Sequence, residues 1–318
     1  MEGTTKVKVR PEELNRLARA AFDSGVAESL ELTDGWANSA YKLVLDDGRK
    51  AVLKVAPTKN VKQMRYERNM MRAEVDAMRL MREVGGVPVP EVYIFDESEA
   101  ILPASYFIME HLEGEPYNKA RETMTPERRE TVERELGVLN RRINEVKGNR
   151  FGLFAYETPH DGSWREAFRW LIRGVLEDGR EMGVVLPAPY EEFEREIERR
   201  LPALDEVKEP RLVHWDLWAG NVFVQGDRIT GTIDFERAMW GDPLIEHYFS
   251  HFDDTTAFKQ GHGWQAEEPG RRIRRSLYDL YLDLILVVEC QFRQYTDRDH
   301  VEWTANNLAA GWERFRSI

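Results

Sequence analysis

The chain has 318 residues, a net charge of −12 at pH 7 with neutral histidines, and a single cysteine. Its length allows one large domain or two lobes, its negative charge argues against nucleic-acid binding, and one cysteine excludes an intramolecular disulfide framework. Because no apolar run approaches the roughly 20 residues of a membrane span and the chain start has no hydrophobic signal core, we expect a soluble cytoplasmic protein.

The first third of the chain predicts a small β-rich lobe. A short amphipathic helix is expected over residues 11–21, and helical periodicity of apolar residues predicts a second helix over residues 60–83, before Gly85-Gly86. Alternating apolar residues bounded by turn signals predict strands over residues 29–32, 40–45, 50–55, 91–96 and 105–110. We therefore expect five strands packed with one main helix.

The remainder of the chain is predicted to be mainly helical. Helices are expected over residues 126–146, 163–182, 189–206, 242–253, 271–296 and 299–315. Residues 1–110 carry a net charge of −2 and the remainder carries −10. Much of this surplus is ordinary solvated helix surface, but an acidic lobe also attracts a cationic substrate, and both interpretations stay open.

The most informative segment runs from residue 214 to residue 236. It places Asp216, Asn221 and Asp234 around two short apolar strands joined by a turn, which predicts a hairpin that brings Asp234 close to Asn221. Phosphoryl transfer from a nucleotide needs a carboxylate for the accepting hydroxyl, and an amide oxygen plus a carboxylate for magnesium. The residue types and their spacing therefore indicate phosphoryl transfer rather than separate turn-capping residues.

On these residues the segment resembles the aminoglycoside phosphotransferase and choline kinase family. Residues 214–221 resemble its catalytic loop and residues 233–236 its metal-binding motif. The resemblance implies an α+β, bilobal, protein-kinase-like fold, with a nucleotide-binding lobe over residues 1–110 and a catalytic and substrate-binding lobe over residues 111–318. It also implies that Asp216 is the catalytic residue and that Asn221 and Asp234 hold Mg²⁺.

The resemblance extends to the nucleotide-binding residues of the first lobe. Lys54, on an apolar strand, would hold the nucleotide phosphates and needs an anionic partner, for which Glu74 is the candidate, with Glu67 and Asp76 as alternatives. Residues 34–39 resemble the family's variant nucleotide loop, and the backbone near the end of the fifth strand would contact adenine. The expected nucleotide-binding residues are Lys54, Glu74, Gly35, Asn38, Ser39, Glu110 and Leu112.

The expected acceptor is a small molecule. Only residues 235–240 separate Asp234 from Gly241-Asp242-Pro243, so there is no room for the activation segment that a protein kinase needs. We expect an ATP-dependent kinase of a small-molecule hydroxyl, with GTP also open as donor and an aminated acceptor such as an aminoglycoside favoured by the acidic second lobe. The alternatives are a non-cationic acceptor such as a macrolide or sugar derivative, and a catalytically inactive nucleotide-binding regulatory protein.

Several residues invite other interpretations. His247 and His251 are four residues apart on a predicted helix, but the HExxH motif is missing and we expect structural roles. His214 is expected to position the catalytic loop rather than to act as base. Glu246 stands where the family often has Asp, so any shared role is open. Cys290 lies in an apolar helix and is expected to be a small core residue.

Overall fold

An antiparallel sheet of five strands forms the N-terminal lobe of the computed structural model, which describes residues 6–318 apart from 34, 36–37, 156–161, 254 and 265–268. The strand order is β1-β2-β3-β5-β4. All five strands expected from the sequence are present, which confirms the predicted sheet. Their bounds are β1 (Val26–Leu32), β2 (Ser39–Leu45), β3 (Lys50–Val55), β4 (Val92–Asp96) and β5 (Tyr106–Glu110).

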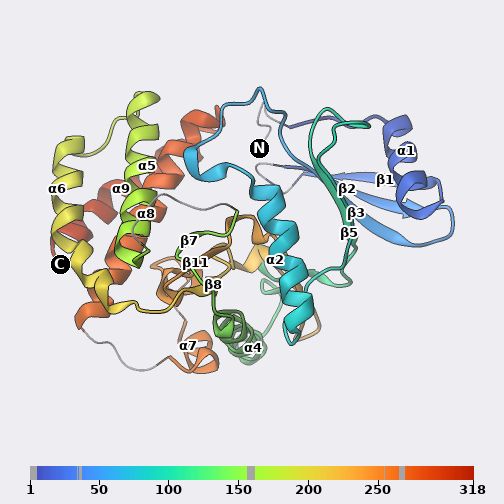
Figure 1. The fold of residues 1–318 in the computed structure, drawn as a ribbon. Helices are drawn as coiled ribbons and strands as arrows, with labels where there is room; N and C mark the ends of the chain where they lie inside the picture. Colours follow the sequence, from blue (N-terminus) through green and yellow to red (C-terminus); the bar gives the residue numbers. More distant parts are fainter. Residues whose placement is uncertain (1–5, 34, 36–37, 156–161, 254, 265–268) are drawn as a thin grey trace.

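Helices α1 (Pro11–Phe22) and α2 (Met70–Val84) cover the two faces of this sheet (Figure 1). Leu53 of β3 packs on the α1 side, while Val52 packs on the α2 side. Side chains alternate along a strand, so Lys54 lies on the same face as Val52. The strand therefore directs the Lys54 ammonium toward α2 and the second lobe.

The helix predicted over residues 60–83 is wrong in its first half. Helix α2 begins at Met70, after a single 3₁₀ turn, η1 (Arg65–Glu67), and a left-handed Asn69 with φ 59°. Met64 and Tyr66 are buried in the core of the C-terminal lobe, whereas Met71 belongs to the core beneath the sheet. The apolar residues that made the sequence periodic thus belong to two different cores, and tertiary packing overrides the local helical pattern.

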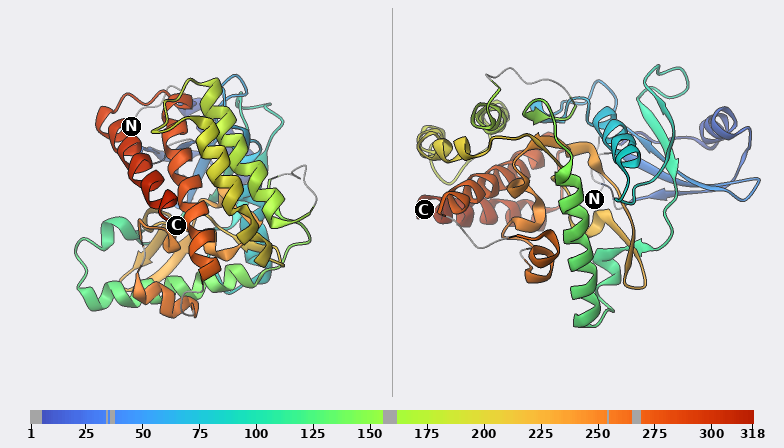
Figure 2. Two further views of the ribbon diagram at one scale, coloured as in Figure 1. Left: turned by 90° about the vertical axis from the view of Figure 1, so that its left-hand side faces the viewer. Right: turned by 60° about the horizontal axis from the view of Figure 1, so that its bottom comes forward.

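The C-terminal lobe is mainly helical and lies on the opposite side of α2 from the sheet (Figures 1 and 2). Most helices lie where they were predicted, although the segment predicted over residues 189–206 ends its α-helix at Arg200 and continues as a 3₁₀ helix. The helices are α3 (Tyr117–Ala120), α4 (Pro126–Glu145), α5 (Trp164–Glu181), α6 (Tyr190–Arg200), η2 (Leu201–Glu206), α7 (Thr256–His262), α8 (Pro269–Phe292) and α9 (Arg298–Arg316).

Two small sheets of this lobe hold the segment of residues 214–236. One has the strand order β10-β9-β6 and the other β7-β11-β8. Strands β9 and β10 form the predicted antiparallel hairpin. The strands are β6 (Glu115–Pro116), β7 (Gly152–Leu153), β8 (Arg211–Val213), β9 (Val222–Gln225), β10 (Arg228–Thr232) and β11 (Met239–Gly241).

The helix predicted over residues 242–253 is also wrong. Two 3₁₀ turns replace it, η5 (Pro243–Ile245) and η6 (His247–Phe249), separated by Glu246 in an extended conformation with ψ 147°. The Glu246 carboxylate accepts hydrogen bonds from another loop instead of facing solvent, as described below. His247 and His251 therefore do not share a helix face.

None of the helices in the described part of the chain has the length and apolar character that a membrane span requires. Strand β5 ends at Glu110 and β6 pairs with β9 of the second lobe. A lobe boundary between residues 110 and 111 stays a prediction.

Candidate active site

The predicted catalytic loop, residues 214–221, follows the end of β8 at residue 213, and His214 fixes its path. The His214 Nε2 atom donates to the carbonyl oxygen of Ile233 at 2.9 Å, while its Nδ1 atom accepts from the backbone N–H of Asp216 at 3.2 Å. Only a neutral imidazole can donate with one nitrogen and accept with the other, and burial lowers the pKa of His214. These contacts agree with the expected positioning role.

A buried carboxylate holds the loop in a strained conformation. Trp215 has φ 62°, and a bulky residue in this left-handed region costs about 1–3 kcal/mol, which the surroundings must offset. The Glu246 carboxylate, fully buried, accepts from the backbone N–H groups of Trp215 at 3.2 Å and Leu217 at 3.4 Å, and from Asn140 Nδ2 at 3.0 Å. The sequence left the role of Glu246 open, and these contacts identify it as the group that holds the loop.

Asp216 and Asn221 are brought together within this loop. The Asn221 Nδ2 atom donates to the Asp216 carbonyl oxygen at 2.9 Å and to Asp216 Oδ2 at 3.2 Å, which turns the amide oxygen Oδ1 away from Asp216. Ile233 N donates to the Asn221 carbonyl oxygen at 3.0 Å, so the hairpin places Asp234 beside Asn221, as predicted. Burial raises the pKa of Asp216 to about 8, against the opposing effect of the Arg237 guanidinium.

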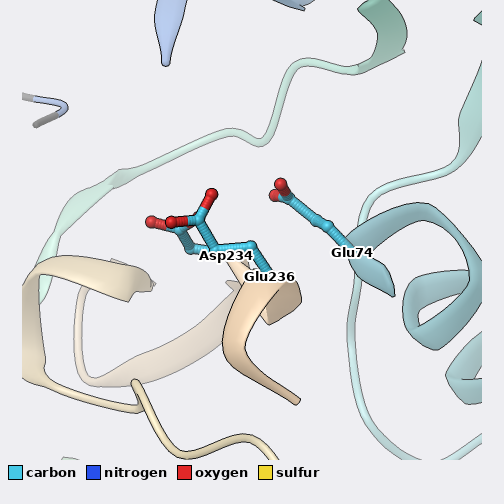
Figure 3. Close-up of side chains that lie close together, drawn as sticks. All are labelled: Glu74, Asp234 and Glu236. Carbon is cyan, nitrogen blue, oxygen red and sulfur yellow. The ribbon is translucent and has the colours of Figure 1, made fainter. Parts of the chain in front are cut away.

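Lys54 is the centre of a cluster of carboxylates from both lobes. Its Nζ atom lies 2.6 Å from Glu74 Oε2, 2.6 Å from Asp234 Oδ1 and 3.4 Å from Glu236 Oε2. Figure 3 shows Glu74 reaching from α2 toward Asp234 and Glu236. Burial lowers the pKa of Lys54, but the three carboxylates outweigh it and raise that pKa well above its ordinary value.

The alternatives to Glu74 are resolved by this geometry. Glu67 pairs with Arg293 at 2.6 Å, and Asp76 lies on the surface 3.9 Å from Arg79. Glu74 is 1% exposed, and burial raises its pKa to about 8 against the effect of Lys54. Its Oε1 atom has no hydrogen-bond partner within the described residues.

The cluster fits a divalent cation. Oxygen atoms of Glu74, Asp234 and Glu236 lie within 4.8 Å of one another, and a single ammonium group, that of Lys54, faces all three carboxyl groups. Carboxylate and amide oxygens are the ligands that Mg²⁺ prefers, and Asn221 adds an amide oxygen nearby. Asp234 adopts a left-handed backbone with φ 70°, which directs its side chain into this space.

The other predicted nucleotide-binding residues are less closely connected with the cluster. Asn38 Nδ2 donates to Glu236 Oε2 at 2.7 Å, so this loop residue reaches the cluster. The Gly35 carbonyl oxygen accepts from Lys6 Nζ at 2.6 Å, and Ser39 is buried in β2. Residues 34, 36 and 37 of the predicted loop lie outside the described residues. Nucleotide contacts of Gly35, Asn38 and Ser39 stay predictions.

At the end of β5, Glu110 Oε2 accepts from the backbone N–H of Glu91 at 3.1 Å. The Leu112 side chain lies so close to Gly231 that an added Cβ there would approach it to 2.3 Å. Leu112 thus contacts strand β10 of the second lobe, whereas this contact of Glu110 lies within the first lobe. Their predicted contacts with adenine stay predictions.

Sequence reasoning missed a second buried cluster beside the catalytic loop. It contains two guanidinium groups, two carboxylates and a phenol, and no local spacing signals it because its members come from segments up to 226 residues apart. We call it the Glu289 cluster. Its members are Tyr66, Glu67, Arg237, Glu289 and Arg293.

The residues expected to be structural have ordinary partners. His247 Nε2 lies 3.1 Å from Asp253 Oδ2, and His251 Nδ1 lies 3.5 Å from Asp279 Oδ1. Cys290 is buried on α8, where its thiol donates to the Leu286 carbonyl oxygen.

The two lobes, the catalytic loop and the cluster between them define a bilobal, protein-kinase-like fold. A solved structure of a thermostable mutant of aminoglycoside phosphotransferase APH(4)-Ia, in complex with AMP-PNP and hygromycin B, has the same fold, with a TM-score of 0.65 at 19% identity over 96% of this chain and 98% of that one. The model of the phosphotransferase enzyme family matches residues 29–272. The chain therefore belongs to this family and is a phosphotransferase.

Two curated proteins are also similar to this chain in sequence. A probable ketoamine kinase of Vibrio cholerae is 28% identical over 226 residues, which are 66% of this chain and 71% of that protein. A probable acyl-CoA dehydrogenase, IBR3, of Arabidopsis thaliana is 24% identical over 181 residues. That match spans 56% of this chain but only 22% of the plant protein.

Proposed function

We propose that the protein transfers the γ-phosphoryl group of ATP to a hydroxyl group of a small molecule. The observation that carries the proposal is the meeting of two sets of groups at one place. Lys54 and Glu74 from the N-terminal lobe lie against Asp234, which the β9–β10 hairpin holds beside Asn221 and Asp216. These are the groups that phosphoryl transfer requires.

Each residue has a separate task in the proposed reaction. Lys54, oriented by Glu74, binds the negatively charged phosphates of the nucleotide. Asp216 orients the acceptor hydroxyl and accepts its proton while the oxygen attacks the γ-phosphorus, and ADP leaves. Its raised pKa, about 8 in the ligand-free protein, suits a group that takes up a proton near neutral pH. His214 and Glu246 maintain the loop geometry, so catalysis depends chiefly on positioning and electrostatics.

Asn221 and Asp234 would hold Mg²⁺, with Glu236 close enough to contribute. When bound, the ion neutralises negative charge on the phosphates. GTP remains an alternative donor, because the backbone near Glu110 and Leu112 would select the base.

The proposed acceptor is a small molecule that carries an amine, such as an aminoglycoside. The net charge of −10 on residues 111–318 favours a cation, and the relatives include a ketoamine kinase and an enzyme solved with hygromycin B. We also infer a cytoplasmic location, because the donor nucleotide is an intracellular metabolite and Cys290 is a buried free thiol.

The test is a phosphotransfer screen with Mg-ATP and two acceptor panels, ketoamines and aminoglycosides, with neutral macrolides as the comparison panel. Product formation by the natural protein and its loss in Asp216→Asn are the expected results. The amine preference is wrong if the macrolides are the better acceptors, and the kinase proposal is wrong if the protein binds no Mg-nucleotide.

A further inference from the structure

We call residues 61–69 the connecting segment. They are part of the link between β3, which carries Lys54, and α2, which carries Glu74. Although they belong in sequence to the N-terminal lobe, they pack on the other lobe. Tyr66 is 4% exposed within the large-lobe core. The backbone N–H of Arg65 donates to Asp178 Oδ2 at 2.9 Å, and its guanidinium pairs with Asp178 and Glu181 of α5.

The connecting segment also contacts α8, through Glu289, and the turn that follows it, through Arg293, by means of buried polar groups. The Tyr66 hydroxyl donates to Glu289 Oε1, and Arg293 Nη2 donates to Glu67 Oε1 at 2.6 Å. Helix α8 therefore holds the chain between the two residues that are proposed to bind and orient the nucleotide phosphates.

Glu289 Oε1, which accepts from Tyr66, also accepts from the residue that follows the predicted metal-binding motif, residues 233–236. We call residues 233–237 the metal-binding segment. Arg237, the residue after Glu236, donates through Nη2 to Glu289 Oε1 at 2.6 Å. The Arg237 guanidinium carbon lies 5.7 Å from the centroid of the Tyr66 ring and 5.8 Å from that of the Trp215 ring. Trp215 directly precedes Asp216, so one carboxylate oxygen connects the connecting segment, the metal-binding segment and the side of the catalytic loop.

Separating the hydrogen-bonded groups around Glu289 costs free energy because they are buried. Glu289 is 5% exposed and its carboxylate faces Arg237 and Arg293. Moving Arg237 away from Glu289 separates two buried opposite charges, and moving Tyr66 away leaves a buried hydroxyl without its acceptor. The three segments are therefore stable together in one arrangement rather than independently.

We propose that Glu289 is a positioning residue, which couples the placement of Lys54 and Glu74 to that of the catalytic loop and Asp234 by accepting hydrogen bonds from both Tyr66 and Arg237. This inference rests on the proposed kinase function for its effect on turnover, but not for the structural coupling itself. Glu289 is not proposed to touch substrate.

The test compares Glu289→Gln with Asp178→Asn in the full-length protein. Both variants weaken the attachment of the connecting segment, but only Glu289 also contacts Arg237. Amide hydrogen exchange, measured by mass spectrometry without nucleotide, should rise in residues 61–69 in both variants. It should rise in residues 234–241 in Glu289→Gln only.

Turnover is measured with an acceptor from the screen and counted per nucleotide-binding site, so that unfolded protein does not contribute. We expect kcat to fall on the order of 10- to 100-fold in Glu289→Gln, as misplacement of catalytic groups does, and KM for Mg-ATP to rise by a smaller factor, because the placement of Lys54 and Glu74 is also loosened. Asp178→Asn should retain kcat within a few-fold. A purely structural residue would lower the melting temperature without this difference in kcat.

Tyr66→Phe is the second variant, to be used if Glu289→Gln does not fold. It removes only the hydroxyl that donates to Glu289 and keeps the buried ring. It should also raise exchange in residues 234–241, which Tyr66 does not hydrogen-bond directly. Unchanged exchange there in both Glu289→Gln and Tyr66→Phe, or equal losses of kcat in Glu289→Gln and Asp178→Asn, would overturn the proposal. If the natural protein transfers no phosphate, the kinase function fails, and the exchange measurements alone decide the coupling.

Discussion

The Lys54 cluster and the Glu289 cluster are both buried between the lobes, yet their charges are arranged differently. Around Lys54, one ammonium faces three carboxylates, and Glu74 Oε1 has no partner among the described residues. Around Glu289, the guanidinium groups of Arg237 and Arg293 face the carboxylates of Glu289 and Glu67. The first cluster therefore has three carboxyl groups for one cationic group, whereas the second has two of each.

This difference matches the two proposed roles, in which the Lys54 cluster binds a ligand and the Glu289 cluster positions chain segments. A buried surplus of carboxylates raises the free energy of the ligand-free protein, and a bound cation removes that cost. A balanced cluster needs no ligand, so it can hold segments in place throughout the reaction cycle. Both kinds of cluster perturb pKa values, and the different numbers of acidic and basic groups in them are the reason why we propose a bound cation only at the first.

The largest expected effect is on turnover, and it tests the residues at and beside the Lys54 cluster. Asp216→Asn should leave Mg-nucleotide binding nearly intact and lower kcat by roughly 10²–10⁴-fold, the usual contribution of a general base. Asp234→Asn should also weaken magnesium-dependent nucleotide binding, because it removes a proposed ligand. Calorimetric titration and steady-state kinetics measure the two quantities, and equal effects of both variants on nucleotide affinity would contradict the separate roles.

Arg293→Leu should break the balanced cluster. The free energy of unfolding should fall by about 3–5 kcal/mol, because Glu67 is left as a buried charge without its partner. The double variant Glu67→Leu/Arg293→Leu should recover much of this loss in chemical denaturation. Arg195→Leu on α6, at a side chain 67% exposed, is the matched control and should change little. Equal stability of the single and double variants would show that the cluster is not balanced in this sense.

Mg-ATP should stabilise the protein by binding at the carboxylate-rich Lys54 cluster. A ligand present at about 100 times its dissociation constant adds roughly 2.7 kcal/mol to the free energy of unfolding. Thermal denaturation should show the melting temperature rising with Mg-ATP in the natural protein and in Asp178→Asn, but much less in Asp234→Asn. A melting temperature that does not respond to Mg-ATP, Mg-ADP or Mg-GTP argues against a nucleotide site.

Acid should weaken the balanced cluster through Glu289. Although burial raises the pKa of Glu289, Arg293 and Arg237 outweigh it and lower that pKa below its ordinary value of 4.5. A lowered folded-state pKa contributes stability that is present above the unfolded pKa and is lost as pH falls through the folded pKa. The difference in melting temperature between natural protein and Glu289→Gln should therefore be largest near neutral pH and shrink below pH 4.5. A constant difference from pH 7 to pH 3 would contradict this assignment.

The sequence by itself determined the elements whose signals are local. Alternating apolar residues marked all five strands of the sheet, and the pattern from His214 to Asp234 marked the loop and hairpin that position Asp216 and Asn221. These predictions succeeded because strand alternation, turn chemistry and motif spacing all act over a few residues.

Only the tertiary structure decided which segments, distant in the sequence, contact one another. The sequence pattern predicts a helix over residues 60–69. Met64 and Tyr66 instead pack in the apolar core of the other lobe, separate from the core in which α2 is buried. Residues 242–253 look helical, but the buried carboxylate of Glu246 binds the backbone of the catalytic loop. The Glu289 cluster joins residues more than 200 positions apart, and no local pattern encodes such a contact, because its energy depends on burial that exists only after the lobes have packed.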